Sequence, residues 1–286
     1  MSALRCALVC ATLSLQGAAQ SPAFEVVSVK PNNTEDVRSM RMQVLPGGRL
    51  SVAGLPLLAL LARSYNLPMN PSERLSGVPE WAIHERYDIE AKAPAGAFPE
   101  GLPASEARAK MQAMIQALLA DRFKLVMRRE TKDIPIYALI VAKGGPKLQK
   151  AGTAEADCQL GIADGVTCHQ FMGGQGRGLH ARAVDMKDLA GYIENWTDHP
   201  VVDQTGLDGL FAMDTDGWIP MRLPPPPPPG VAAPNPNARP SGDGDMSDTT
   251  RPTLFTVLRR LGLDLKQEKG PVDVYVVEHV ERPAEN

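Results

Sequence analysis

Apolar and polar residues alternate along several short segments in the first half of the chain, and this period of two predicts β-strands. Between these segments apolar residues recur at every third or fourth position, which predicts amphipathic helices. Pro56 suits the first turn of one helix, and Ser105 is expected to cap the other. The predicted strands are residues 24–30, 40–44, 49–53 and 86–91, and the predicted helices are 56–65 and 105–119.

Two β-hairpins are predicted, one near the middle of the chain and one at its end. The first is formed by residues 123–129 and 136–142, around a turn at 133–135. The second half then repeats the succession of patterns seen in the first. It predicts strands at 179–184 and 210–214, helices at 186–193 and 254–261, and a closing hairpin of 263–265 and 272–280.

Individual residues also correspond between the two halves. Residues 118–125 align with 258–265, and Ile136-Tyr137 aligns with Val274-Tyr275 when the intervening turn is shortened. We interpret this as an internal duplication. The sequence therefore predicts an α+β fold of two tandem, similar β-α-β-α-β-β units, with small antiparallel or mixed sheets and helices on one face. Chance similarity between two amphipathic halves is the alternative.

The proline-rich segment decides where the second unit lies. Six consecutive prolines begin at Pro224, and polar and small residues follow. Such a composition cannot bury a core. Because the second unit needs the helix that follows, we interpret residues 219–250, approximately, as an insertion within that unit rather than a linker between domains. A docking peptide is the functional alternative. The predicted division is therefore a first unit at 20–150, a disulfide loop and linker at 151–178, and a second unit at 179–286.

Residues 1–19 are typical of a cleavable signal peptide. Arg5 supplies the charge, and the apolar run at 6–15 is too short to cross a bilayer, which needs about 20 residues. Small residues precede the expected cut between Ala19 and Gln20. An N-terminal core helix and a lipid anchor at Cys10 are less favoured alternatives. The mature chain is therefore predicted to be periplasmic or secreted, without a membrane-spanning segment.

Only two cysteines, Cys158 and Cys168, remain after this cleavage. An even pair in an oxidising compartment predicts a disulfide, and closing so short a loop stabilises the fold by about 2.8 kcal/mol in the chain-entropy description. The alternative is half a zinc site completed by His169 and His180. The cysteine spacing does not suit zinc, so we predict the disulfide and no metal.

Composition and motifs narrow the classes of function. The net charge is −3 and aromatic residues make up 5%, so the chain has neither the basic excess nor the stacking platform that nucleic-acid binding requires. It contains no motif of the serine hydrolases, zinc proteases or phosphate-binding loops. The glycine-rich residues 173–178 follow no predicted strand, so we interpret them as a mobile linker rather than a dinucleotide loop. No catalytic residue and no cofactor are predicted.

Three residues are candidate contacts with a ligand or partner. Arg128 and Arg129 could bind an anion, although a solvated strand end is the commoner role of such residues. Trp196 could line a ligand groove, although packing at the edge of a core is commoner. Asp203 is instead expected to form a tight turn through hydrogen bonds from the backbone to its side chain.

Taken together, several segments resemble a large family of uncharacterised exported proteins that is expanded in soil bacteria. One departure is that the family often has a histidine where this chain has Arg128. The resemblance extends over nearly all of the mature chain. The segments that carry it are 24–31, 46–50, 77–81, 87–92, 119–125, 135–139, 143–148, 200–207 and 277–286.

The resemblance implies a sensory or binding role outside the cytoplasm. Some relatives are similar domains fused behind a membrane metallopeptidase of the β-lactam-sensor type. The units also look like small βα modules in the periplasmic parts of secretins and outer-membrane receptors, an analogy of fold alone. We therefore expect a non-catalytic module that binds an envelope protein or a small ligand.

Two other classes of function are alternatives to this expectation. One is an envelope hydrolase whose site gathers His84, His199 or His279 with a carboxylate in one cleft. The other is a structural protein of the cell surface. The first alternative requires a histidine and a carboxylate to lie together in one cleft, and a structure can test this directly.

Overall fold

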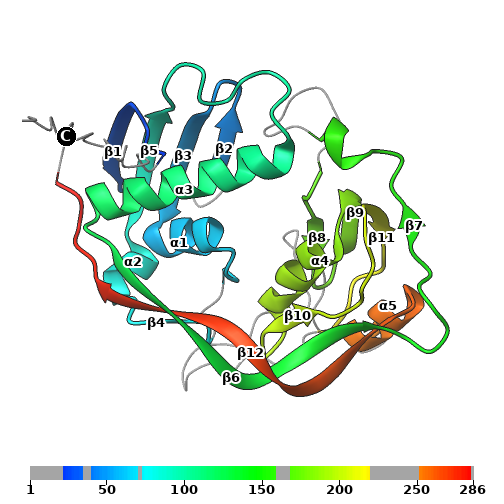
Figure 1. Cartoon of the computed structure of the whole chain (residues 1–286). Coiled ribbons are helices and arrows are strands. Elements are labelled where there is room, and N and C mark those ends of the chain that lie inside the picture. The colour runs from blue at the N-terminus through cyan, green and yellow to red at the C-terminus, as the bar shows by residue number, and fades with distance from the viewer. Residues whose placement is uncertain (1–21, 35–39, 70–72, 159–167, 220–250, 285–286) are drawn as a thin grey trace, which may run out of the picture.

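The computed structural model describes residues 22–34, 40–69, 73–158, 168–219 and 251–284. They form two α+β lobes that lie side by side on a long two-stranded ribbon (Figure 1). The predicted leader at 1–19, with its cut at Ala19 and Gln20, lies outside the described residues, as does nearly all of the proline-rich insertion. No helix in the described part of the chain has the length and apolar composition needed to cross a membrane.

The first lobe is built on a four-stranded antiparallel sheet of order β1-β5-β3-β2. Two helices cover one face of this sheet (Figure 1). Leu50, Ile89, Leu118 and Phe123 are buried between the layers, and each such side chain contributes about 1.5–3 kcal/mol by leaving water. The elements are β1 (Val26–Asn32), β2 (Arg41–Leu45), β3 (Arg49–Pro56), α1 (Leu57–Tyr65), α2 (Glu80–His84), β5 (Arg86–Lys92) and α3 (Ala104–Arg122).

The second lobe has its own four-stranded sheet, of order β7-β11-β9-β8. Two helices pack on it, and Leu189, Leu258 and the fully buried Trp218 form part of its core. The elements are β7 (Gln149–Lys150), η2 (Glu155–Asp157, a 3-10 turn), β8 (Met172–Gly174), β9 (Gly178–Val184), α4 (Met186–Ile193), η3 (Glu194–Trp196, a second 3-10 turn), β11 (Phe211–Asp214) and α5 (Leu254–Arg260).

The ribbon that joins the lobes consists of β6 (Val126–Val141) and β12 (Leu263–His279), which pair antiparallel along their whole length. A short parallel strand flanks each of them. β10 (Val201–Asp203) of the second lobe pairs with β6, and β4 (Leu75–Ser76) of the first lobe pairs with β12. Each lobe therefore contributes one long strand and one short strand to the same sheet, of order β10-β6-β12-β4.

The element order of the first half recurs in the second. β3-α1-β5-α3-β6 corresponds to β9-α4-β11-α5-β12, and the sheet orders β1-β5-β3-β2 and β7-β11-β9-β8 match strand for strand. In the ribbon, Tyr137 and Tyr275 occupy equivalent places, because each lies beside the parallel strand from the opposite lobe. The predicted fold class, mixed α+β with small antiparallel and mixed sheets, is confirmed.

The two predicted hairpins are wrong. The expected turn at 133–135 is extended and pairs with residues 269–271 of β12, so β6 and β12 are single long strands. Residues 133–135 all keep negative φ, as the extended backbone of a paired strand does. Pro135 and Pro271 are tolerated because the middle of the ribbon has no third strand to which their missing N–H would donate.

Two smaller expectations are also wrong. Ser105 does not cap α3, because the helix begins at Ala104 with Pro103 in the cap position and without a side-chain cap. The glycine-rich residues 173–178 are not a linker but form β8 and the turn into β9. Gly174 has φ +126°, and a Cβ there would lie 2.6 Å from the Trp196 ring. Glycine therefore allows this turn to pack against Trp196.

The described ends of the proline-rich insertion lie together. The backbone N–H of Ile219 donates to the carbonyl of Pro252 at 3.0 Å. The chain thus leaves and re-enters the second lobe at one place, the geometry expected of an insertion within a unit.

Candidate functional site

Cys158 and Cys168 form the predicted disulfide, and both are buried. They pack against Ala104 at the start of α3 and against Ala183 and Leu210 of the second lobe. The disulfide therefore lies where the first helix layer meets the second lobe. It also fixes the position of the next residue, His169.

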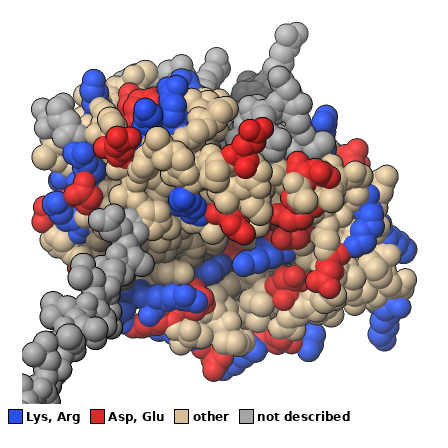
Figure 2. All heavy atoms as spheres, turned by 45° about the horizontal axis from the view of Figure 1, so that its top comes forward, with Lys and Arg blue, Asp and Glu red and all other residues tan. Residues whose placement is uncertain are grey.

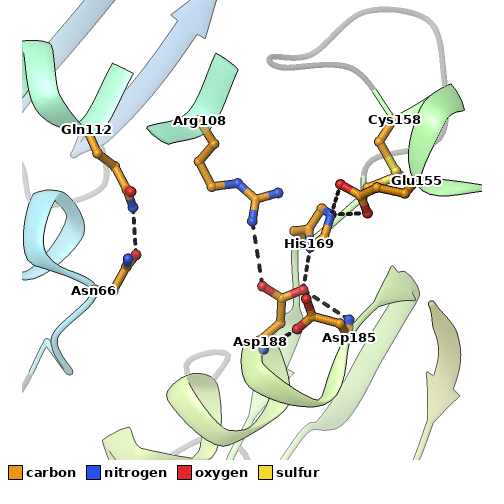
Figure 3. A network of polar contacts seen from close by, with 9 residues as sticks. Asn66, Arg108, Gln112, Glu155, Cys158, His169, Asp185 and Asp188 are labelled. Atoms are coloured by element: carbon orange, nitrogen blue, oxygen red, sulfur yellow. Dashed lines mark hydrogen bonds and ion pairs between the residues drawn. A yellow bond between two sulfur atoms is a disulfide. The ribbon is translucent and has the colours of Figure 1, made fainter. Parts of the chain in front are cut away.

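His169 lies between two carboxylates that come from different elements (Figure 3). Its Nδ1 is 2.6 Å from Oδ2 of Asp188 in α4, and its Nε2 is 2.9 Å from Oε2 of Glu155 in η2. The His169 side chain is only 6% exposed. Because an ionised carboxylate can only accept hydrogen bonds, the ring satisfies both carboxylates at once only when both of its nitrogens carry a proton.

The charges around the ring support this protonation state. Burial alone would lower the pKa of His169, but the hydrogen bond and charge of Asp188, with a further contribution from Glu155, raise that pKa overall. Arg108 of α3 opposes the rise, since its Nη1 lies 3.7 Å from Oδ1 of Asp188. Burial likewise tends to raise the pKa of Asp188, but His169 and Arg108 lower it.

Asp185 and Asp188 together cap α4. Oδ1 of Asp185 accepts the Asp188 backbone N–H at 2.6 Å, and Oδ2 of Asp188 accepts the Asp185 backbone N–H at 3.1 Å. Burial raises the pKa of Asp185. The Asp188 carboxylate thus serves a helix N-terminus, His169 and the arginine of the other lobe at once.

The ligand types of this cluster invite comparison with a metal site. His169 lies within 4.8 Å of Asp185 and Asp188, and of Glu155 and Cys158. The Cys158 sulfur is held in the disulfide and offers no thiolate. Ligands on a tetrahedral zinc lie about 3.3 Å apart, whereas Nδ1 and Oδ2 are 2.6 Å apart, a direct hydrogen bond. The Arg108 guanidinium also lies beside this carboxylate, so the cluster as it stands is held by hydrogen bonds and an ion pair.

The partner expected for His169 in the zinc alternative, His180, lies in a separate pocket of about 630 Å³ on the second lobe. Its Nδ1 is 2.7 Å from Asp214, and its Nε2 donates to the carbonyl of Arg177 at 2.8 Å. Arg260, from the end of α5, pairs with Asp216 at 2.9 Å. Arg177 also lines the pocket, and within the described chain it has no carboxylate partner.

In this conformation both ring nitrogens of His180 are engaged, one with the Asp214 carboxylate and the other with the Arg177 carbonyl. The pocket is lined by charges of both signs, the guanidinium groups of Arg177 and Arg260 and the carboxylates of Asp214 and Asp216. It can therefore offer charged hydrogen-bond donors to a ligand.

The three candidate contact residues lie on two different parts of the molecule. Arg128 pairs with Glu278 at 2.6 Å and also with Glu130, and Arg129 pairs with Asp273 at 2.5 Å, all on the ribbon. Trp196 is half-buried in the second lobe. Its ring packs edge-on to those of Tyr192 and Trp218, at centroid distances of 5.0 and 5.4 Å. A ligand role for these residues stays a prediction.

The histidines of the hydrolase alternative are not gathered in one acidic cluster. His84 ends α2, the His199 ring lies 5.7 Å from that of Tyr137, and His279 pairs with Glu281 at 2.8 Å. Among the described residues, both clusters of three or more potential ligand side chains contain His169 instead. The turn predicted at Asp203 is confirmed, since its Oδ1 accepts hydrogen bonds from the Thr205 backbone and hydroxyl.

Figure 2 shows Lys and Arg side chains interspersed with Asp and Glu over the face that it presents. Arg108, Glu155 and Asp188 were not among the residues predicted from the sequence to form a site. The one available signal was the Asp185-x-x-Asp188 spacing at a predicted helix start, which is typical of a cap. Nothing in the local sequence links that cap to residues 108 and 155.

Comparison with known proteins gives a family and no precedent for the site. Residues 58–280 match a family described as a protein of unknown function, DUF3738. No curated protein matches the chain, and no solved structure does.

Proposed function

Because the chain belongs to the DUF3738 family, whose function is unknown, we propose a function from its own residues: it is an exported, non-catalytic binding module. Its ligand is a small molecule or envelope component that presents a carboxylate or phosphate to the pocket of the second lobe. The expectation that some relatives are fused to a membrane sensor of the metallopeptidase type agrees with such a role.

Two features support export. Residues 1–19 have the pattern of a cleavable leader. The Cys158–Cys168 disulfide is of a kind that persists in oxidising compartments and is rare in reducing ones. Expression of the full chain in a bacterial host should give a periplasmic or secreted product that begins at Gln20. Recovery of an uncleaved, reduced chain from the cytoplasm would argue against export.

The pocket carries the binding proposal. A cavity of about 630 Å³ lies within the usual range for small-molecule sites. Arg177 offers a planar set of donors that matches a carboxylate or phosphate. Arg260 lies in the same wall, and its partner Asp216 is well exposed, so a stronger anion can replace it. Val257 and Leu261 add an apolar surface beside these charges.

The binding test uses the mature chain, residues 20–286, and a panel of probes. Inorganic phosphate, amino acids, dicarboxylates and cell-wall fragments would be screened by thermal shift, and each hit would be mapped by NMR. We expect at least one hit whose shift changes centre on the pocket and whose affinity falls about tenfold or more in R177A/R260A, since a charge-assisted bidentate contact contributes about 1.5–3 kcal/mol.

The control is R41A, which removes an exposed arginine from β2 in the other lobe. It should bind every hit like the wild type. Binding that R177A/R260A leaves unchanged, or a panel without a hit, would rule out the pocket as the ligand site.

A further inference from the structure

One carboxylate, that of Asp188, faces two cationic side chains, each through a different oxygen (Figure 3). His169 contacts its Oδ2 at 2.6 Å from the disulfide segment, and Arg108 approaches its Oδ1 at 3.7 Å from α3 of the first lobe. Of the two cations, only the histidine can lose its charge near neutral pH. The site therefore contains a titratable group at the contact between the lobes.

We propose that His169 is a proton switch: protonated, it ties the disulfide turn at Glu155 to α4 at Asp188, and deprotonated, it releases Glu155 while its remaining N–H still donates to Asp188, whose charge is then paired with Arg108 alone. The switch thus couples the order of the disulfide turn to the contact between the lobes. This inference is independent of the pocket and of the proposed ligand.

The asymmetry of burial decides which contact is lost. A neutral imidazole has a single N–H and can satisfy only one of the two carboxylates. The Asp188 side chain is 18% exposed and also caps α4, whereas that of Glu155 is 44% exposed. Removing the histidine donor from the more buried carboxylate costs more than returning the exposed carboxylate to water. The remaining proton therefore stays on Nδ1, and Glu155 separates from Nε2.

The charged groups that face the ring come from three elements. They are Asp185 and Asp188 of α4, Glu155 of η2 and Arg108 of α3. The carboxylates hold the proton on His169, and Arg108 favours its loss. The backbone of His169 also fits a fixed role for the ring. It adopts φ +57°, the left-handed region that a non-glycine residue enters at a cost of about 1–2 kcal/mol.

The test follows His169 by NMR in the mature chain across a pH titration, with hydrogen exchange of residues 155–158 measured in parallel. We expect the His169 pKa to lie above that of a free histidine. The protection factors at 155–158, which compare exchange with the intrinsic rate at the same pH, should fall about two- to fivefold as the ring deprotonates, the effect of losing one partly exposed ion pair. Both curves should share one midpoint.

Two surface variants should shift the midpoint of the His169 titration in opposite directions. E155Q removes one carboxylate and should lower the midpoint, whereas R108A removes the opposing cation and should raise it. E100Q, which changes an exposed carboxylate ahead of α3, should leave the midpoint unchanged. All three side chains are exposed or nearly so, and the fold should survive each change.

Three outcomes would overturn the proposal. The first is a His169 midpoint at or below that of a free histidine. The second is protection against exchange at 155–158 that does not change as His169 titrates. The third is a His169 midpoint that is lower in R108A than in the wild type. Binding to the pocket by phosphate or other probes would be unaffected by any of them, so failure of this inference and failure of the proposed function are separable.

Discussion

At the scale of single residues, the cluster around His169 shows how the fold assigns a role that the sequence leaves open. The neighbouring cysteines were predictable as a disulfide, because an even pair of cysteines behind a predicted signal peptide favours one. The role of His169 was not predictable. Its partners Glu155 and Asp188 belong to separate elements, and only tertiary packing brings them to opposite ring nitrogens.

The pair of contacts at His169 should make stability depend on pH. The folded-state pKa of His169 is raised above its unfolded value. Its contribution to the free energy of unfolding is therefore fully present below about pH 6.5, and it is lost as the pH rises through the folded-state pKa. H169N should thus be destabilised by about 1.5–3 kcal/mol under mildly acidic conditions and by clearly less under alkaline ones. Asparagine tolerates the left-handed backbone at this position.

Urea unfolding of the wild type and H169N from about pH 5 to about pH 9 measures this difference. H84N is the control, because it makes the same change at the end of α2, away from the cluster. A constant gap between wild type and H169N across the titration would mean that packing, not the charge of His169, stabilises the site.

At the scale of elements, local patterns were informative and long-range pairing was not. The helix at 186–193 was predicted at its observed bounds, because its apolar stripe is sufficient evidence for a helix. The long strands β6 and β12 were each predicted as a hairpin. A strand that folds back and a strand that pairs with its counterpart in the other unit have the same alternation. The choice depends on a partner far away in the sequence.

The turn between β8 and β9 gives an element-scale prediction. G174A would place a Cβ 2.6 Å from the Trp196 ring at φ +126°, a conformation that L side chains rarely adopt. It should lower the free energy of unfolding by about 1–3 kcal/mol through overpacking, and backbone strain adds to this loss. The near-ultraviolet circular dichroism of the tryptophans should change with it.

G191A is the matched control. Gly191 lies inside α4, and a Cβ there meets nothing within 4 Å. Alanine should stabilise this helix by up to about 1 kcal/mol. Equal effects of G174A and G191A in thermal unfolding would contradict the packing that the structure gives Trp196.

At the scale of the whole molecule, the lobes are held together by more than the ribbon. The repeated architecture places β4 of the first lobe and β10 of the second on the outer edges of one sheet. Close to these strands, Arg74 of the first lobe pairs with Glu194 of the second at 3.1 Å. The Glu194 carboxylate, 2% exposed, also accepts the backbone N–H of Val201 at 3.3 Å. Burial raises the pKa of Glu194, and Arg74 and this backbone hydrogen bond counteract the rise.

This buried pair should couple the two lobes energetically. E194A or R74A alone should each lower the free energy of unfolding by about 3–5 kcal/mol, because each leaves a charge without its main partner in a desolvated site. The double variant R74A/E194A should cost clearly less than the sum of the two, since neither charge is left behind. Urea unfolding of the wild type, the two single variants and the double variant gives the coupling energy.

The exposed pair of Arg260 and Asp216 serves as the reference double-mutant cycle, with an expected coupling of about 1 kcal/mol or less. Strictly additive losses at Arg74 and Glu194 would show that this pair does not couple the lobes. A large coupling would identify this pair as a second polar contact between the lobes, at the C-terminal end of α4, whereas Asp188 of the His169 cluster lies at its N-terminal end.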